Sequence, residues 1–112
     1  MNHQKKHFNK ELLIENMGSD DDFLKMLLEL YFNSFSSYLE TIKDAIFKND
    51  IILFKKTIHS IKGSSSTLCF EIMSDFLEHL GKIDFSHLDK IFGLITKIEK
   101  EYNYLIVNLR NN

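Results

Sequence analysis

The sequence predicts an all-α fold, an antiparallel four-helix bundle with a short additional helix at the N-terminus. The 112 residues include no proline and only four glycines, so little interrupts helix formation. Apolar residues recur at spacings of three and four along most of the chain, which is the period of an amphipathic helix. Only short turns separate these periodic segments, as expected for antiparallel neighbours in a bundle.

The first predicted helix is short. Its apolar positions are Phe8, Leu12, Leu13 and Met17, and Gly18 is placed to end it. We expect it to lie as a lid on the first half of the second helix.

The second helix is predicted to begin after Ser19, whose hydroxyl can cap the free amides, with Asp22 completing a capping-box-like arrangement. It runs to about Lys48. Its first half is apolar nearly all round, through Phe23, Leu24, Leu27, Leu28, Leu30, Tyr31, Phe32 and Phe35. Its second half has a narrower stripe, made of Leu39, Ile42, Ala45 and Ile46.

Three further helices follow. Asp50 is the predicted cap of the third, whose apolar positions are Ile51, Phe54, Ile58, Ile61 and Leu68. The fourth spans roughly Glu71 to Lys82, with inward residues Ile72, Met73, Phe76, Leu77 and Leu80. Ser86 is the predicted cap of the fifth, whose apolar positions are Leu88, Ile91, Ile95, Ile98, Tyr102, Leu105 and Leu109.

Composition excludes several classes of function. Fourteen basic and sixteen acidic side chains give a net charge of −2, with no basic stripe for nucleic acid. No segment has the length of a transmembrane helix or the apolar core of a signal peptide. Cys69 is the only cysteine, which rules out an internal disulfide. We therefore expect one domain over residues 1–112, cytoplasmic and monomeric, with no nucleic acid or membrane partner.

No metal site is predicted either. His3 and His7 are one helical turn apart, but they lie near the terminus and we expect them to be solvated. Asp75 and His79 share the same spacing, yet no second pair completes a metal site of the helical-bundle type.

One histidine of the third helix is predicted to face outward. Ile58 and Ile61 belong to the buried stripe, and His59 lies about 100° from Ile58 around the helix axis. An exposed neutral imidazole is a nucleophile near neutral pH, which suits it to covalent phosphoryl carriage.

Small and cationic residues share the face of His59. Spacings of three and four place Lys55, Lys62 and Gly63 there, with Ser66 two turns on. Lys62 can balance the charge of a phosphoryl group. A glycine inside a helix costs about 1 kcal/mol relative to alanine, so the absent side chain of Gly63 indicates clearance for a partner.

The stretch "HSIKGSSSTLCF" resembles the motif of the histidine-phosphotransfer (HPt) family: histidine, any residue, an apolar residue, lysine, glycine and then small residues. The resemblance extends over nearly the whole chain. It implies that His59 is phosphorylated, that Lys62 gives electrostatic support and that Gly63 provides clearance. The implied partners are receiver domains of response regulators and a sensor or hybrid histidine kinase, with magnesium bound only in the receiver.

Under this interpretation the chain carries phosphate without being an ATP-dependent enzyme, because it lacks a Walker pattern. Lys55, Ser66 and Phe70 are the predicted docking residues. The "GSSS" segment contributes small residues, Ser64, Ser65 and Ser66, to a close contact between helices.

Two positions depart from the family pattern. Relatives usually have glycine ten residues after the histidine, where this sequence has Cys69. A left-handed backbone would cost about 1–2 kcal/mol there, so we expect a remodelled turn. Relatives often place a glutamate or glutamine that hydrogen-bonds the histidine at the position of Gly81. Glu78, one turn earlier, is the nearest replacement, and His79 is the next.

Alternative functions stay open. "HSIKG", with Thr67 and Phe70 at their spacing, is also similar to the phosphoacceptor domain of chemotaxis-type histidine kinases, for which ATP in another domain would be the donor. A receiver-binding helical adaptor that carries no phosphate is compatible with Cys69 and Gly81. A helical metal-binding bundle is a third alternative.

Overall fold

Helices form every regular element of residues 4–110, the part of the chain that the computed structural model describes. In chain order they are α1 (Lys10–Met17), α2 (Asp21–Phe47), α3 (Ile51–Thr67), α4 (Glu71–Lys82), α5 (Leu88–Leu105) and a final π-helical turn, η1 (Ile106–Arg110). No strand occurs within this range. The all-helical prediction is confirmed.

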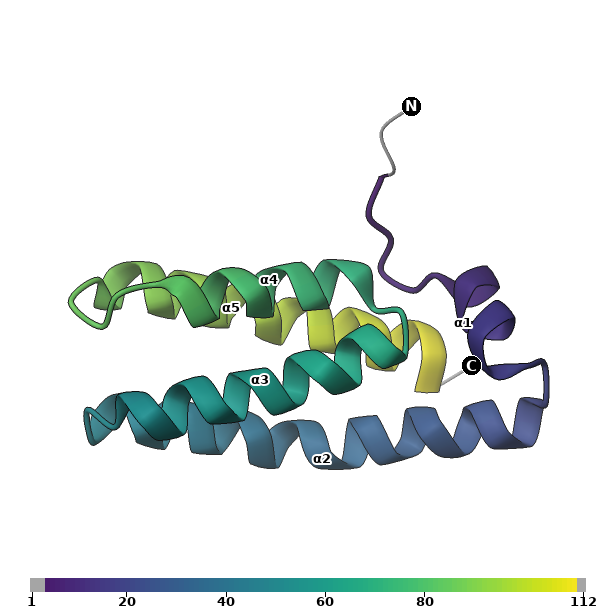
Figure 1. The fold of residues 1–112 in the computed structure, drawn as a ribbon, viewed down its shortest axis with the longest axis horizontal. Helices are drawn as coiled ribbons and strands as arrows, with labels where there is room; N and C mark the ends of the chain where they lie inside the picture. The colour runs from purple at the N-terminus through teal and green to yellow at the C-terminus, as the bar shows by residue number, and fades with distance from the viewer. Residues whose placement is uncertain (1–3, 111–112) are drawn as a thin grey trace.

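The four longer helices lie lengthwise beside one another. Figure 1 shows α2 joined to α3 at one end, α3 joined to α4 at the opposite end, and α4 joined to α5 at the first end. α3 packs against α2 and α4, and α4 packs against α5. α2 also reaches α5, because the rings of Phe35 and Tyr102 stack with centroids 4.0 Å apart. The Tyr102 hydroxyl donates a hydrogen bond to the carbonyl of Phe32 (2.8 Å).

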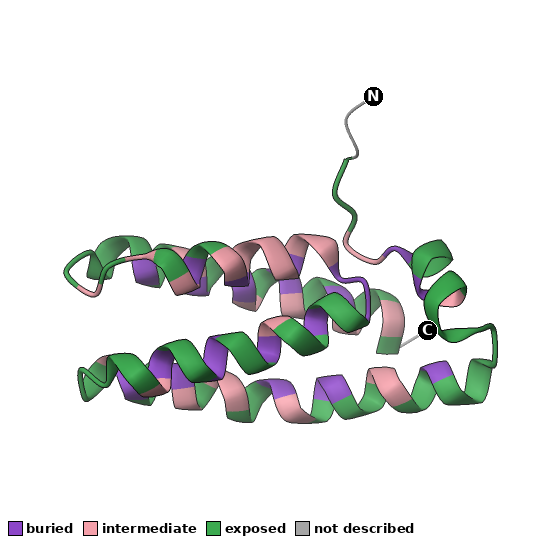
Figure 2. Cartoon of the chain, viewed as in Figure 1, coloured by how far each residue is buried: buried purple, intermediate pink, exposed green. Residues whose placement is uncertain are grey.

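Apolar side chains from all five α-helices fill the interior. Figure 2 shows the buried positions on the faces that the long helices turn toward one another. The largest fully buried side chains are Leu13, Phe35, Ile42, Phe54, Ile61, Phe70, Met73, Leu77, Leu80, Ile91, Ile98 and Leu105. The inward stripe predicted for the third helix is correct for Phe54, Ile58, Ile61 and Leu68, whereas Ile51 in its first turn is 45% exposed.

A buried hydroxyl pair joins α2 to α3. The Tyr31 hydroxyl lies 2.8 Å from Oγ of Ser65, which in turn donates to the carbonyl of Ile61 (2.8 Å). Because the Ser65 hydroxyl already donates to Ile61, the Tyr31 phenol is the donor to Ser65. Burial also raises the pKa of Tyr31 above its usual value. Of the three serines predicted at a helix contact, Ser65 is fully buried, whereas Ser64 and Ser66 are exposed.

Two predicted helix starts differ from the structure. Asp20, and not Ser19, caps α2, because its carboxylate accepts hydrogen bonds from the backbone N–H groups of Asp22 (3.0 Å) and Phe23 (3.2 Å). The helix begins one residue later than predicted, which leaves Ser19 outside it.

The start of α5 is shifted in the same way. His87 occupies the cap position without a side-chain cap bond, so the predicted cap at Ser86 is wrong. The backbone N–H of Ser86 instead donates to the carboxylate of Asp84 (2.8 Å), which forms a turn ahead of the helix. The predicted cap of α3, Asp50, is correct, since its carboxylate accepts from Leu53 N–H (3.0 Å).

α1 does not lie along α2 as predicted. Gly18 ends α1 as expected, with φ +89° and its N–H bonded to the carbonyl of Ile14 (2.8 Å). The helix sits at the end of the molecule where α3 turns into α4 (Figure 1). Asn9 holds it there, because its backbone N–H donates to the carbonyl of Cys69 (3.0 Å) and its amide donates to Glu71 (3.0 Å).

The turn at Cys69 is left-handed and not remodelled. Cys69 has φ +60°, its N–H donates to the carbonyl of Ser66 (3.0 Å), and the N–H of Phe70 donates to the carbonyl of Ser65 (3.0 Å). This pair of bonds is a Schellman motif with cysteine at the position that favours glycine. Asn49 occupies the same position after α2, with φ +56°. The prediction of a remodelled turn at Cys69 was therefore wrong.

The strain at this turn is measurable with two variants that both remove the thiol. We expect Cys69→Gly to be more stable than Cys69→Ala by about 1 kcal/mol in chemical denaturation, because only glycine adopts the left-handed conformation freely. The same pair at Ser60, an exposed position inside α3, should show the opposite order. Equal stability of the two Cys69 variants would contradict a strained turn.

Candidate functional site

His59 lies on the outer surface of α3, beside α4. Ile58 and Ile61 are 3% and 1% exposed, whereas the imidazole is exposed, so the predicted outward orientation is correct. The ring borders a surface hollow of about 210 Å³ between the two helices. We call this the His59 hollow, and its lining residues are Lys55, Ile58, His59, Lys62, Leu77, Glu78, Gly81 and Lys82.

An ion pair bridges α3 and α4 at this hollow. The ammonium group of Lys62 donates to one carboxylate oxygen of Glu78, and Lys82 binds the other oxygen at 2.9 Å. The predicted hydrogen bond between Glu78 and His59 is not formed. Lys62 lies across the helix interface from Glu78 and forms an ion pair with its carboxylate. No residue in the described range hydrogen-bonds His59.

The lysines keep Glu78 ionised. The hydrogen bond from Lys62, followed by the one from Lys82, lowers the pKa of Glu78 to about 2. The charged groups of the hollow are thus the ammonium groups of Lys55, Lys62 and Lys82 and one carboxylate, a net charge of +2 beside the imidazole. A small dianion would neutralise this charge.

Two glycines leave space near the imidazole. A Cβ atom added to Gly63, four residues after His59, would have nothing within 4 Å. At Gly81 it would lie 3.5 Å from a methyl group of Ile58, an ordinary contact. The surface beside His59 is therefore open to a partner at Gly63.

The three predicted docking residues do not share one environment. Lys55 is exposed and borders the His59 hollow. Ser66 is exposed on α3, two helical turns after His59. Its hydroxyl lies 3.2 Å from that of Ser74. Phe70 is fully buried, so its predicted role in docking is wrong. The left-handed turn directs Phe70 inward, where its ring contacts Tyr31 with centroids 4.9 Å apart.

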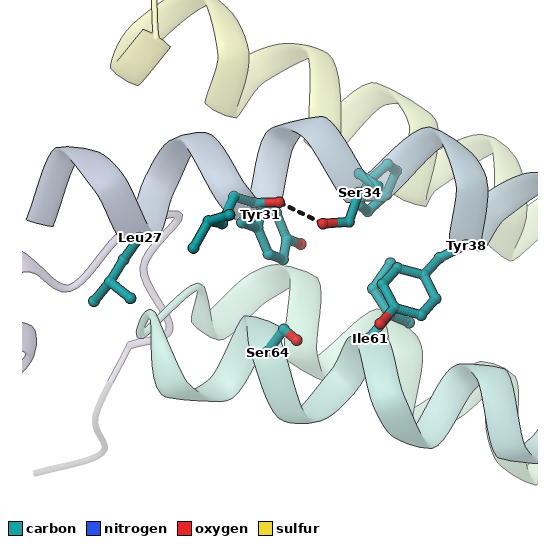
Figure 3. Close-up of a pocket in the computed structure, with 8 residues that line it drawn as sticks. Leu27, Tyr31, Ser34, Tyr38, Ile61 and Ser64 are labelled. Carbon is teal, nitrogen blue, oxygen red and sulfur yellow. Dashed lines mark hydrogen bonds between the residues drawn. The ribbon is translucent and has the colours of Figure 1, made fainter.

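A second hollow, of about 180 Å³, lies on the α2 side of α3. Figure 3 shows side chains of α2 on one wall and those of Ile61 and Ser64 on the other. Its lining residues are Leu27, Leu30, Tyr31, Ser34, Phe35, Tyr38, Ile61 and Ser64. They include no carboxylate, imidazole or amine, so no base lines this hollow to activate the hydroxyl groups that border it.

The sequence interpretation missed a part-buried contact between His7 and Glu101. Nδ1 of His7 lies 2.8 and 3.0 Å from the two carboxylate oxygens of Glu101, which is 6% exposed, and the imidazole stacks on Tyr104. His7 is only partly solvated, because its side chain is 42% exposed and also contacts Glu101, and His3 lies outside the described residues. Glu101 sits between Ile98 and Leu105 on the buried face of α5, and this charge within an apolar stripe was the available signal.

No three histidine, cysteine, aspartate or glutamate side chains of residues 4–110 come close enough to hold a metal ion. No helix in the same range combines the length and apolar character needed to cross a membrane.

Comparisons with known proteins add no relative. No protein-family model matches the chain. No curated protein sequence matches it. No solved structure matches it either. Functional inference therefore rests on the residues and geometry described above.

Titration of Glu78 tests the ion pair directly. Because its folded pKa is lowered from 4.5 to about 2, the pair contributes stability above about pH 4.5, and this contribution is lost as pH falls toward 2. We expect a carboxyl carbon NMR titration to give a midpoint near 2. Lys62→Met should raise that midpoint more than Lys82→Met does. An unchanged midpoint in Lys62→Met would mean that the contact with α3 is absent in solution.

Proposed function

We propose that the protein is a phosphorelay carrier of the HPt type, in which His59 receives a phosphoryl group from a receiver-domain aspartate and passes it to another. The observation that carries this proposal is the exposed imidazole in a hollow of net charge +2, beside the open surface at Gly63. The partners would be the receiver domains of a hybrid kinase and a response regulator in two-component signal transduction.

The proposed fold is the antiparallel four-helix bundle of this family, made of α2, α3, α4 and α5, with α1 as an additional N-terminal helix. The contacts of α3 with both α2 and α4 support it, as do the Phe35 and Tyr102 rings that join α2 to α5. A single-domain, monomeric and cytoplasmic protein fits this role.

The transfer step needs one nucleophile from this chain. The lone pair of a neutral imidazole nitrogen forms a P–N bond, while the P–O bond of the aspartyl phosphate breaks and its electron pair leaves on the carboxylate. The other ring nitrogen keeps its proton, so the total charge is conserved. The receiver supplies the acidic pocket and magnesium. The reverse reaction delivers the phosphoryl group to the second receiver.

Each neighbour of His59 has a proposed part. Lys62 and Lys55 offset the phosphoryl charge, and Gly63 lets the partner's active site approach. Ser66 lies farther along α3 as a contact for the docked receiver. Glu78 acts on Lys62 and not on the imidazole, which distinguishes this site from relatives with a glutamate or glutamine bonded to the histidine.

A receiver-binding adaptor without phosphate is the second candidate. The observation that favours it is that no described residue hydrogen-bonds His59, so nothing fixes the orientation of the ring. This adaptor would bind receivers with the same affinity after His59→Gln and would take up no phosphate.

His59→Gln separates the two candidates. Incubation with a phosphorylated receiver should label the parent with acid-labile, base-stable phosphate and should leave His59→Gln unlabelled. Its melting temperature should change little, because the exposed imidazole is outside the core. Absence of label in the parent, with receiver binding intact, would favour the adaptor.

Gly63→Gln tests how the donor approaches. Glutamine keeps good helix propensity but projects over the open surface, so transfer from a receiver should fall by about tenfold or more while labelling by phosphoramidate persists. Gly93 is a matched control, since it is exposed on α5 and a Cβ there also meets nothing within 4 Å. Gly93→Gln should leave both reactions unchanged. Loss with both donors would indicate a damaged nucleophile, and loss with neither would place docking elsewhere.

A further inference from the structure

The cation proposed to support the phosphoryl group already has an anionic partner. In the unphosphorylated protein the ammonium of Lys62 is bound by Glu78, whose second oxygen is held by Lys82 at 2.9 Å. The side chains of Lys62 and Glu78 are 38% and 35% exposed, so water reaches both and the contact can open.

We propose that Glu78 is a positioning residue that limits the lifetime of phosphorylated His59 by competing with the phosphoryl group for Lys62 and by repelling it. The inference rests on the proposed function and specifies how that site is regulated. Glu78 thereby keeps the phosphoryl group easy to transfer.

Charge in the hollow supports this inference. A phosphoryl group brings about 1.5 to 2 negative charges at pH 7. Lys62 is three residues from His59 on the same helix, so the phosphoryl group lies within its reach. Glu78 borders the same hollow and stays ionised at physiological pH, so two anions would share the same cation. Lys55 and Lys82 are the remaining charged groups there, and neither removes the competition at Lys62.

Neutralising Glu78 at constant size should therefore stabilise the phosphorylated state. Glu78→Gln frees Lys62 and removes one negative charge beside the phosphoryl group. Because these groups are partly exposed, we expect a change of about two- to fivefold.

The test uses the full chain phosphorylated on His59 by phosphoramidate, a donor that releases ammonia and needs no receiver. Phosphate release to water breaks the P–N bond: its electron pair returns to the ring nitrogen, which restores the neutral imidazole, and the water oxygen and its protons leave with inorganic phosphate. Glu78→Gln should slow this release about two- to fivefold and shift the transfer equilibrium with a receiver toward His59 by a similar factor. Glu78→Asp, which keeps the charge, should resemble the parent.

Asp75→Asn is the matched control. Asp75 lies on the same helix, pairs with Lys5 and is 29% exposed, but it does not border the His59 hollow. This variant should release phosphate at the parental rate. Raising the salt concentration from about 0.05 to 0.5 M should reduce the difference between Glu78→Gln and the parent, an effect that a purely structural role would not produce.

A double-mutant cycle with Lys62→Met shows whether Glu78 acts on the phosphoryl group through Lys62 or by direct repulsion. If Glu78 acts through Lys62, the effect of Glu78→Gln should shrink in the Lys62→Met background. An unchanged release rate in Glu78→Gln, with His59 labelled, would overturn this inference and leave the proposed function intact. Failure to label His59 in the parent would overturn both. Labelling without transfer to any receiver would overturn only the relay.

Discussion

The left-handed turn at Cys69 determines where most other features lie. Its two backbone bonds end α3 and direct Phe70 into the core, where the ring meets Tyr31 of α2. The carbonyl of Cys69 accepts the N–H of Asn9, which anchors the N-terminal segment at this end of the molecule. The same reversal sets the register of α4 against α3. The register in turn brings Glu78 to Lys62, beside the exposed His59.

Electrostatics of the His59 hollow follow from that register. One carboxylate among three ammonium groups leaves a net charge of +2, which suits a doubly charged phosphoryl group better than a neutral or cationic ligand. The ion pair between Lys62 and Glu78 also links the two helices that form the hollow. Lys62 and Glu78 therefore contribute both to the charge around the imidazole and to the contact between α3 and α4. A substitution at either residue changes both.

Local periodicity predicted the features that depend on one helix alone. Ile58 and Ile61 face inward and His59 faces outward because helix geometry fixes their relative angles. The cap at Asp20 was missed because serine and aspartate are both good capping residues, and the pattern does not choose between the neighbours Ser19 and Asp20. Contacts between residues far apart in the sequence could not be predicted from periodicity. Glu78 meets Lys62 through the register of two helices, and His7 meets Glu101 across 94 positions of sequence.

We propose that the environment of His59 sets this imidazole apart from the other histidines, and this difference should be visible in the site of phosphate uptake. The chain has five histidines, and His79 and His87 are exposed like His59. Limited labelling by a phosphorylated receiver, followed by peptide mapping in the mass spectrometer under neutral conditions, would locate the phosphoryl group. We expect phosphate on His59 alone. Phosphate distributed over the exposed histidines, or found on His79 or His87 in place of His59, would contradict it.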